Sequence, residues 1–131
     1  MHILKVNDMK KIVFLIVIMV LAVSGCSSPS YKQITQKEAK GMMDEGGVVI
    51  LDVREQDEYD AGHIKDAVLL PVGQIDEQSA KEVIGDKDTV VLVYCRSGNR
   101  SKTASQTLAD LGYTAVFEFG GINTWDYDIE M

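Results

Sequence analysis

Residues 89–111 read TVVLVYCRSGNRSKTASQTLADL, a β-favouring run that passes through a polar loop into an amphipathic segment. The run over 89–94 does not alternate between apolar and polar residues, which is typical of a strand covered on both faces in a parallel sheet. Ala104, Leu108 and Leu111 fall on one face of a helix predicted over 101–111, which Gly112 ends. The stretch therefore predicts one strand–loop–helix unit with Cys95 at its first turn.

The rest of the chain repeats this alternation. Further strands are predicted over 48–53, 67–70 and 115–119, and a further helix over 74–84. A short helix of about two turns follows Thr35, which stands three residues before Glu38 as in a capping box, and Gly46-Gly47 end it. Its Met42 and Met43 are interpreted as core residues. Strand–helix alternation predicts an α/β domain in three layers, with a central, mostly parallel sheet flanked by helices over residues 31–131.

Composition limits the possible functions. The chain has 131 residues with 13 Lys+Arg against 20 Asp+Glu, a net charge of -7, which argues for one domain and against binding to nucleic acid. Two cysteines exclude a disulfide-rich scaffold and a four-cysteine zinc site.

The first residues have the pattern of a secretory signal. Lys10-Lys11 precede twelve unbroken apolar residues, 12–23, which span only about 18 Å as a helix. The residues Val23-Ser24-Gly25-Cys26 resemble a bacterial lipobox. That resemblance implies cleavage of a signal peptide over 1–25, lipidation of Cys26 with a short tether over 26–30, and an extracytoplasmic protein anchored to a membrane. Met9 would begin a complete signal of its own.

Cleavage would change the charge and leave a single thiol. Removing three lysines and one aspartate shifts the net charge from -7 to -9. Cys95 would then be the only remaining cysteine. A lone thiol in an oxidising compartment indicates a reactive cysteine.

The loop after Cys95 has the composition of an anion site. Gly98 and Asn99 tolerate positive φ, so the backbone N–H groups can turn inward, and the following helix adds its positive N-terminus. We expect this geometry, with Arg96, Arg100 and Lys102, to lower the thiol pKa below its ordinary value of about 8.5. Residues 89–109 contain no Asp or Glu, so an anionic substrate would meet little local repulsion.

Four motifs resemble the single-domain rhodanese family. They are Cys95 to Ser101 (CRSGNRS), Asp52-Val53-Arg54, Glu55-x-x-Glu58-Tyr59-x-x-Gly62-His63-Ile64 and Gly120-Gly121-x-x-x-Trp125. The stretch Lys65-Asp66-Ala67 departs from the usual Pro-Gly-Ala in a connecting loop. The resemblance covers about residues 31–128.

The resemblance implies a sulfurtransferase. Cys95 would attack the outer sulfur of a small anionic donor such as thiosulfate and become a persulfide, which passes its sulfur to a thiol or other thiophilic acceptor, possible protein acceptors included. The implied substrate-binding residues are Arg96, Ser97, Gly98, Asn99 and Arg100. The resemblance implies that no metal and no organic cofactor is required. Asp52 and Arg54 are interpreted as structural pairs at the base of the loop.

Other notable residues are given structural interpretations. His63 is expected to be a hydrogen-bonded structural histidine, and Trp125 a core residue. The acidic series Glu55, Asp57, Glu58 and Asp60 is interpreted as a solvated helix face.

Two other functions stay open. A cysteine phosphatase or arsenate reductase would also use a loop after a cysteine, but tyrosine phosphatases have Cys-x5-Arg where Arg100 makes Cys-x4-Arg. The shorter ring suits a sulfur atom better than a phosphate. A sulfur carrier or oxidant sensor with little turnover would have the same sequence.

Overall fold

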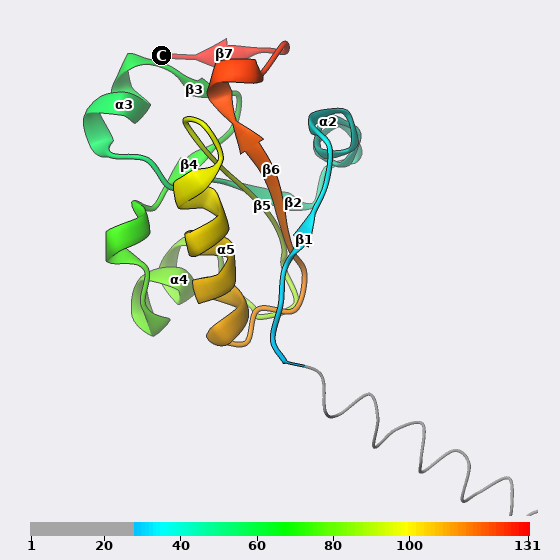
Figure 1. The fold of residues 1–131 in the computed structure, drawn as a ribbon, viewed down its shortest axis with the longest axis vertical. Coiled ribbons are helices and arrows are strands. Elements are labelled where there is room, and N and C mark those ends of the chain that lie inside the picture. Colours follow the sequence, from blue (N-terminus) through cyan, green and yellow to red (C-terminus); the bar gives the residue numbers. More distant parts are fainter. Residues whose placement is uncertain (1–27) are drawn as a thin grey trace, which may run out of the picture.

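The computed structural model describes residues 28–131 (Figure 1). The predicted signal peptide, the lipidation site Cys26 and Ser27 of the tether lie outside these residues. Within the described part of the chain, no helix combines the length and apolar character needed to cross a bilayer.

The predicted parallel sheet is present and has five strands in the order β1-β6-β5-β2-β4. All four pairings in this sheet are parallel. The strands are β1 (Lys32–Gln33), β2 (Val48–Asp52), β4 (Val68–Leu69), β5 (Val90–Cys95) and β6 (Val116–Gly121). The central strands β2, β5 and β6 are the apolar runs seen in the sequence, because both of their faces are covered. β3 (His63–Ile64) and β7 (Ile129–Glu130), which the sequence patterns did not predict, form a separate antiparallel pair.

The helices follow the predicted positions with adjusted ends. They are α2 (Gln36–Glu45), α3 (Gln56–Ala61), α4 (Glu77–Val83) and α5 (Asn99–Asp110), with short 3₁₀ turns at η1 (Val72–Gln74) and η2 (Ile122–Thr124). The prediction of one helix over 74–84 was wrong at its start. The chain makes the turn η1 first, and Asp76 then caps α4 by accepting the Ser79 N–H at 2.8 Å.

The capping box at Thr35 is formed only in half. The Thr35 hydroxyl accepts the Glu38 N–H at 3.0 Å, whereas in the described part of the chain the Glu38 side chain makes no return hydrogen bond. The helix nevertheless runs for 10 residues, longer than the two turns predicted, and ends at Gly46 with φ of 80°. Met42 and Met43 pack against a buried cluster, which confirms them as core residues.

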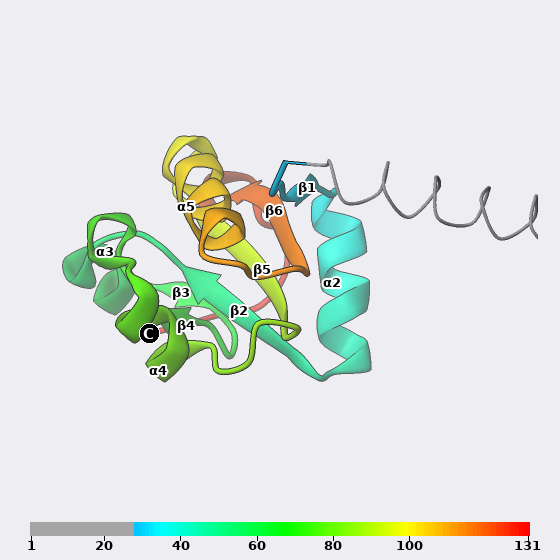
Figure 2. The same cartoon turned by 90° about the horizontal axis from the view of Figure 1, so that it is seen from below.

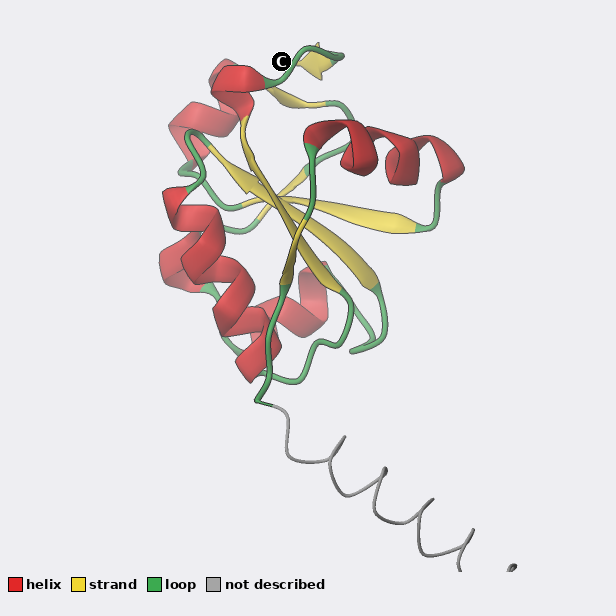
Figure 3. Ribbon diagram, turned by 45° about the vertical axis from the view of Figure 1, so that its right-hand side comes forward, coloured by secondary structure: helices red, strands yellow, loops and turns green. Residues whose placement is uncertain are grey.

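The helices cover the two faces of the sheet unequally. Figures 2 and 3 show α2 alone on one face, with α4 and α5 on the other. The α5 side holds the larger core cluster, which includes Val91, Val93, Ala104 and Leu108, and the α2 side holds Ala39, Leu92, Tyr94 and Phe119. The side chains of successive β5 residues therefore pack into the cores on opposite faces of the sheet, as expected for a buried parallel strand.

The carboxyl edge of the sheet brings three chain segments together. β2 ends at Asp52, β5 ends at Cys95, and β6 continues to Gly121, which pairs with Cys95 after a shift in the register of β5 and β6. Ligand sites in parallel sheets gather at this edge.

Candidate active site at Cys95

Cys95 is the last residue of β5 and is 1% exposed. Its Sγ accepts a hydrogen bond from the backbone N–H of Gly98 at 3.1 Å. Gly98 adopts φ of 100° and stands immediately before α5. The loop therefore turns a backbone amide onto the sulfur, as the sequence predicted. Asn99 was expected to share the positive-φ turn, but it is instead the first residue of α5, so Gly98 makes the turn alone.

The protonation of Cys95 depends on opposing influences. Burial raises the pKa of the Cys95 thiol, but hydrogen bonds from the Ser101 hydroxyl and from backbone N–H groups of Ser101, Gly98 and Ser97 outweigh it. The pKa therefore lies below its ordinary value, as predicted. Hydrogen bonds to the sulfur cause this lowering of the pKa. We had also predicted a contribution from the charges of Arg96, Arg100 and Lys102.

A chain of hydrogen bonds runs from the sulfur into the protein. The Cys95 Sγ lies 3.3 Å from the Ser101 Oγ, and the Ser101 Oγ lies 2.6 Å from Oε2 of Glu118. The same Glu118 oxygen accepts the Gly120 N–H at 2.8 Å. Ser101 is fully buried and Glu118 is 3% exposed. A buried carboxylate thus lies one hydroxyl away from the candidate nucleophile.

Arg100 is held by an acidic residue from a distant segment. Its two terminal nitrogens donate to the two carboxylate oxygens of Glu58 at 2.8 and 2.9 Å. The Arg100 guanidinium, through this hydrogen bonding, lowers the pKa of Glu58 to about 2. The interpretation of Glu58 as part of a solvated helix face was wrong, since folding brings α3 against the Cys95 loop. The acid-free stretch over 89–109 therefore does not make an acid-free site, because Glu58 and Glu118 enter it from elsewhere.

The other loop residues differ in exposure. Arg96, Ser97 and Asn99 are exposed, Gly98 is buried, and Arg100 is intermediate. Among residues 28–131, Arg96 forms no ion pair. Arg96 is therefore the loop guanidinium that can meet an incoming anion without first breaking a contact.

Steric crowding explains why a glycine stands at position 121, at the end of β6. A Cβ on Gly121 would lie 2.1 Å from the carbonyl oxygen of Arg96, far inside any real contact. The backbone of β6 therefore approaches the Cys95 loop more closely than a side chain permits. The Asn123 N–H also donates to the Arg96 carbonyl at 3.2 Å, which fixes the loop from the same side.

Asp52 and Arg54 form the structural pair that the sequence predicted. The Arg54 side chain donates to both carboxylate oxygens of Asp52, with the shortest contact at 2.7 Å. The Tyr94 hydroxyl donates to Asp52 Oδ2 at 2.6 Å, and Arg54 also reaches the Gly62 carbonyl at 2.7 Å. Because Tyr94 directly precedes Cys95, this pair anchors the end of β5.

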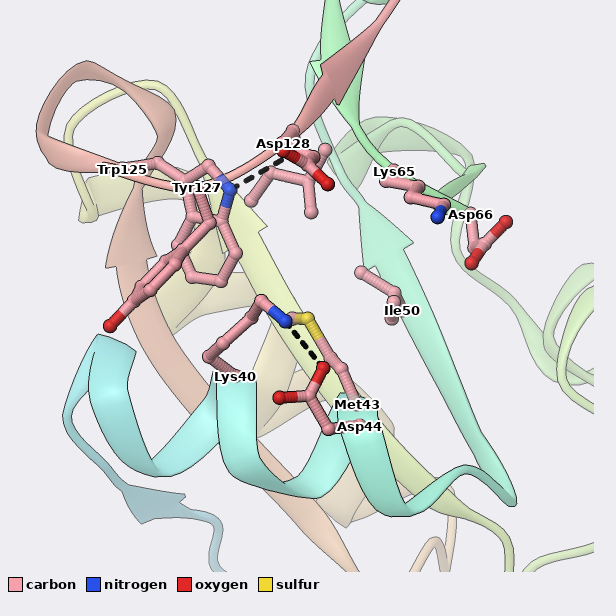
Figure 4. A pocket seen from close by; sticks show the side chains of 10 residues that line it. Lys40, Met43, Asp44, Ile50, Lys65, Asp66, Trp125, Tyr127 and Asp128 are labelled. Atoms are coloured by element: carbon pink, nitrogen blue, oxygen red, sulfur yellow. Dashed lines mark hydrogen bonds and ion pairs between the residues drawn. The ribbon is translucent and has the colours of Figure 1, made fainter.

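His63 and Trp125 make structural contacts. The ring of His63 stacks on Tyr59 with centroids 3.8 Å apart, and its Nδ1 lies 3.0 Å from the Tyr59 carbonyl oxygen. Trp125 packs against Phe119 of the α2-side core and is half-buried. Its other side lines a cavity of about 280 Å³ on the α2 face, shown in Figure 4, together with Lys40 and Tyr127.

A second cavity adjoins the Cys95 loop itself. It has a volume of about 400 Å³, and its lining includes Ser97, Gly98 and Lys102 on one side and Gln36 and Glu118 on the other. Within the described residues, no group of three or more His, Cys, Asp or Glu side chains is placed to hold a metal ion.

Ser101 and Glu118 were not predicted from the sequence to be functional residues, and Glu58 was interpreted only as part of a solvated helix face. Ser101 belongs to the quoted loop motif and Glu58 to the motif that contains His63, so both were present in motifs without a site role. Glu118 gave one signal, a single acid within the apolar strand Val116–Gly121. Its partner Ser101 is 17 positions away, which no local pattern links to it.

Known proteins with similar sequences include sulfurtransferases. Residues 35–128 match the rhodanese-like domain family. The thiosulfate sulfurtransferase GlpE of Coxiella burnetii is 40% identical over 96 residues, which cover 72% of this chain and 87% of that protein. The thiosulfate sulfurtransferase PspE of Escherichia coli is 36% identical over 72 residues, covering 55% of this chain and 68% of that protein.

Solved structures give the same result. A rhodanese with anions from E. coli matches with a TM-score of 0.58 and 28% identity, covering 63% of this chain and 95% of that one. A rhodanese-like domain from Anabaena matches with a TM-score of 0.68 and 26% identity, covering 75% of this chain and 77% of that one. The family match covers 94 residues and includes the loop that directs a backbone N–H to the Cys95 sulfur. The chain therefore belongs to the rhodanese-like domain family.

Proposed function

We propose that this protein is a sulfurtransferase that moves sulfane sulfur from an anionic donor such as thiosulfate to a thiophilic acceptor through a persulfide on Cys95. Sulfur transfer is the activity of the family relatives. The observation that carries the assignment to Cys95 is its Sγ at the end of β5, which accepts the Gly98 N–H at 3.1 Å. N–H donors to the sulfur favour the thiolate and hold it in position for attack.

The proposed reaction has two halves. The Cys95 thiolate attacks the outer sulfur of thiosulfate, the sulfur–sulfur bond of the donor breaks, and sulfite leaves with the bonding electron pair. The persulfide then gives its outer sulfur to the acceptor, and the Cys95 thiolate is regenerated. The loop N–H groups would stabilise the negative charge on the outer sulfur, since such donors are most effective where charge develops.

The two loop arginines would have different roles. The guanidinium of Arg96 is exposed and would attract the sulfonate end of the donor. Arg100 is bound in both of its terminal nitrogens by Glu58 and would fix the loop more than bind the donor directly. Ser97, Gly98 and Asn99 would contribute backbone contacts to the donor.

Replacement of Cys95 tests this mechanism. The full chain in detergent should transfer sulfur from thiosulfate to cyanide, and Cys95→Ser should abolish that transfer because a hydroxyl cannot form the persulfide. Thiocyanate formation measures turnover, and intact mass after treatment with thiosulfate should show one added sulfur atom on the wild type. Turnover by Cys95→Ser would contradict the mechanism, and an added sulfur with little turnover would indicate a carrier.

A lipid anchor at Cys26 is a separate part of the proposal, supported by the sequence around it. Membranes from cells that express the full chain should retain it, and Cys26→Ala should release it into the soluble fraction because the acyl chains are lost. Retention of Cys26→Ala on the membrane would show that the apolar segment 12–23 holds the protein instead.

A further inference from the structure

Glu118 is a buried acid whose hydrogen-bond donors are neutral groups. It lies in β6, between β1 and β5, with its side chain almost fully shielded from solvent. Among residues 28–131, no Lys, Arg or His forms an ion pair with it. Its three donors are neutral: the Ser101 hydroxyl at 2.6 Å, the Gly120 N–H at 2.8 Å and the Gln33 side-chain amide at 3.4 Å. Buried carboxylates are rare unless paired, so this one needs an explanation.

The Ser101 hydroxyl connects this acid to the nucleophile. Its Oγ lies 3.3 Å from the Cys95 Sγ and 2.6 Å from Glu118 Oε2. A hydroxyl has one hydrogen to donate, so it cannot serve the sulfur and the carboxylate together. The state of Cys95 and the state of Glu118 are therefore linked through the direction in which this one hydrogen points.

Two arrangements satisfy all three groups. In the first, the Cys95 thiol donates to Ser101, and Ser101 donates to the Glu118 carboxylate. In the second, protonated Glu118 donates to Ser101, and Ser101 donates to the Cys95 thiolate. Each carries one negative charge. In a third arrangement both groups are ionised. One of them then receives no hydrogen bond from the Ser101 hydroxyl, and only the Ser101 side chain separates the two negative charges.

The geometry points to a proton relay in which Glu118 receives the thiol proton of Cys95 through the Ser101 hydroxyl. The S–H bond of Cys95 breaks as its hydrogen passes to Ser101 Oγ, and the hydrogen of Ser101 passes to Glu118 Oε2. The negative charge moves from carboxylate to sulfur, and no electrons are gained or lost. Glu118 is thus a positioning residue that acts through Ser101, and the inference rests on the proposed role of Cys95 as nucleophile.

The surrounding charges do not replace this relay. Lys102 of α5 lines the same cavity as Glu118, but the ion pairs of the described residues do not include it. Arg100 of α5 is bound by Glu58 of α3, and Arg96 of the loop is exposed. On β1, Gln33 faces Glu118 and is uncharged, while the side chain of Lys32 points to the other face of the sheet because strand residues alternate.

The pH dependence of Cys95 alkylation tests the relay. Iodoacetamide reacts with the thiolate, and mass spectrometry of the Cys95 peptide from the full chain separates this thiol from Cys26. The wild-type rate should rise with pH in two steps, since a pair that shares one proton titrates with two macroscopic values. Glu118→Gln should give a single step and react several-fold faster at the wild-type plateau, because its amide leaves the serine hydrogen free for the sulfur.

Two serine variants complete the test. Ser101→Ala removes the bridging hydroxyl and should give a single step at higher pH, since the sulfur also loses a donor. Ser105→Ala is the matched control, one turn further along α5. Within residues 28–131 its buried hydroxyl has no hydrogen-bond partner, so its removal should leave the two-step curve unchanged.

A spectroscopic measurement on the wild type avoids dependence on variant folding. When Cys95 is in its thiolate form, the relay places the proton on Glu118, so the infrared spectrum should contain a protonated carboxyl band that disappears when Cys95 is alkylated. A single-step wild-type curve, a two-step curve in Ser101→Ala, or no change in that band would overturn the relay. Alkylation needs no sulfur donor, so these results are independent of whether the protein turns over thiosulfate.

Discussion

Two buried carboxylates flank the strand that ends at Cys95, and their surroundings differ. Asp52 closes β2 and lies against Arg54, with the Tyr94 hydroxyl as a further donor. Glu118 lies in β6 on the other side of β5 and receives hydrogen bonds from neutral groups. Both are at most 3% exposed. Burial is therefore the same for the two acids, and only the charge of their donors differs.

The difference separates structural from chemical roles. A carboxylate matched by a guanidinium has a fixed charge, and losing one partner leaves the other charge uncompensated in the interior. A carboxylate matched by a hydroxyl and amides has no such constraint, so it can exchange a proton with a neighbouring thiol. The same strand edge thus holds one acid that anchors β5 and another that can follow the state of Cys95.

The largest expected effect comes from neutralising each acid in turn. Asp52→Asn should lower the free energy of unfolding by about 3–5 kcal/mol, because the buried Arg54 charge is left without its partner. Glu118→Gln should cost only about 1 kcal/mol, the scale of one neutral hydrogen bond. Urea unfolding of both variants measures the difference. Equal losses would show that the two acids are not distinguished by their partners.

The second prediction concerns a variant that should move Glu118 away from Ser101 without replacing either residue. Gly121→Ala places a methyl group against the Arg96 carbonyl and should cost about 1–3 kcal/mol as β6 shifts from the loop. Sulfur transfer should fall sharply while the Asp52–Arg54 pair is kept. Activity and urea unfolding are measured together, and wild-type turnover in this variant would contradict the close-packing argument.

The smallest effect concerns the partly exposed ion pair of Glu58 and Arg100. Because the folded pKa of Glu58 is about 2 against an ordinary 4.5, its contribution to stability is complete above pH 4.5 and is lost as the pH falls toward 2. Partial exposure limits that contribution to about 1 kcal/mol or less. Glu58→Gln should therefore show a shallower loss of unfolding free energy over this range. An unchanged pH dependence would indicate that solvent screens the pair completely.

The fold class was predictable because its signal is local. The apolar runs of β2, β5 and β6 and the amphipathic pattern of α5 are read from neighbouring residues, and they place Cys95 at the end of a strand. The short strands β1, β3 and β7 were missed because they are two residues long and pair across 65 positions or more. The break between η1 and α4 was missed because Asp76 makes its own cap inside a continuous pattern.

The sequence by itself determined the α/β class, the position of Cys95 before a glycine-containing loop, and the pairing of Asp52 with Arg54, since each depends on residues close together in the chain. Only the tertiary structure decided the rest of the site. Glu58 reaches Arg100 across 42 positions, and Glu118 reaches Ser101 across 17. Such contacts depend on distance in space, so acids that are remote in the sequence complete the surroundings of the Cys95 loop.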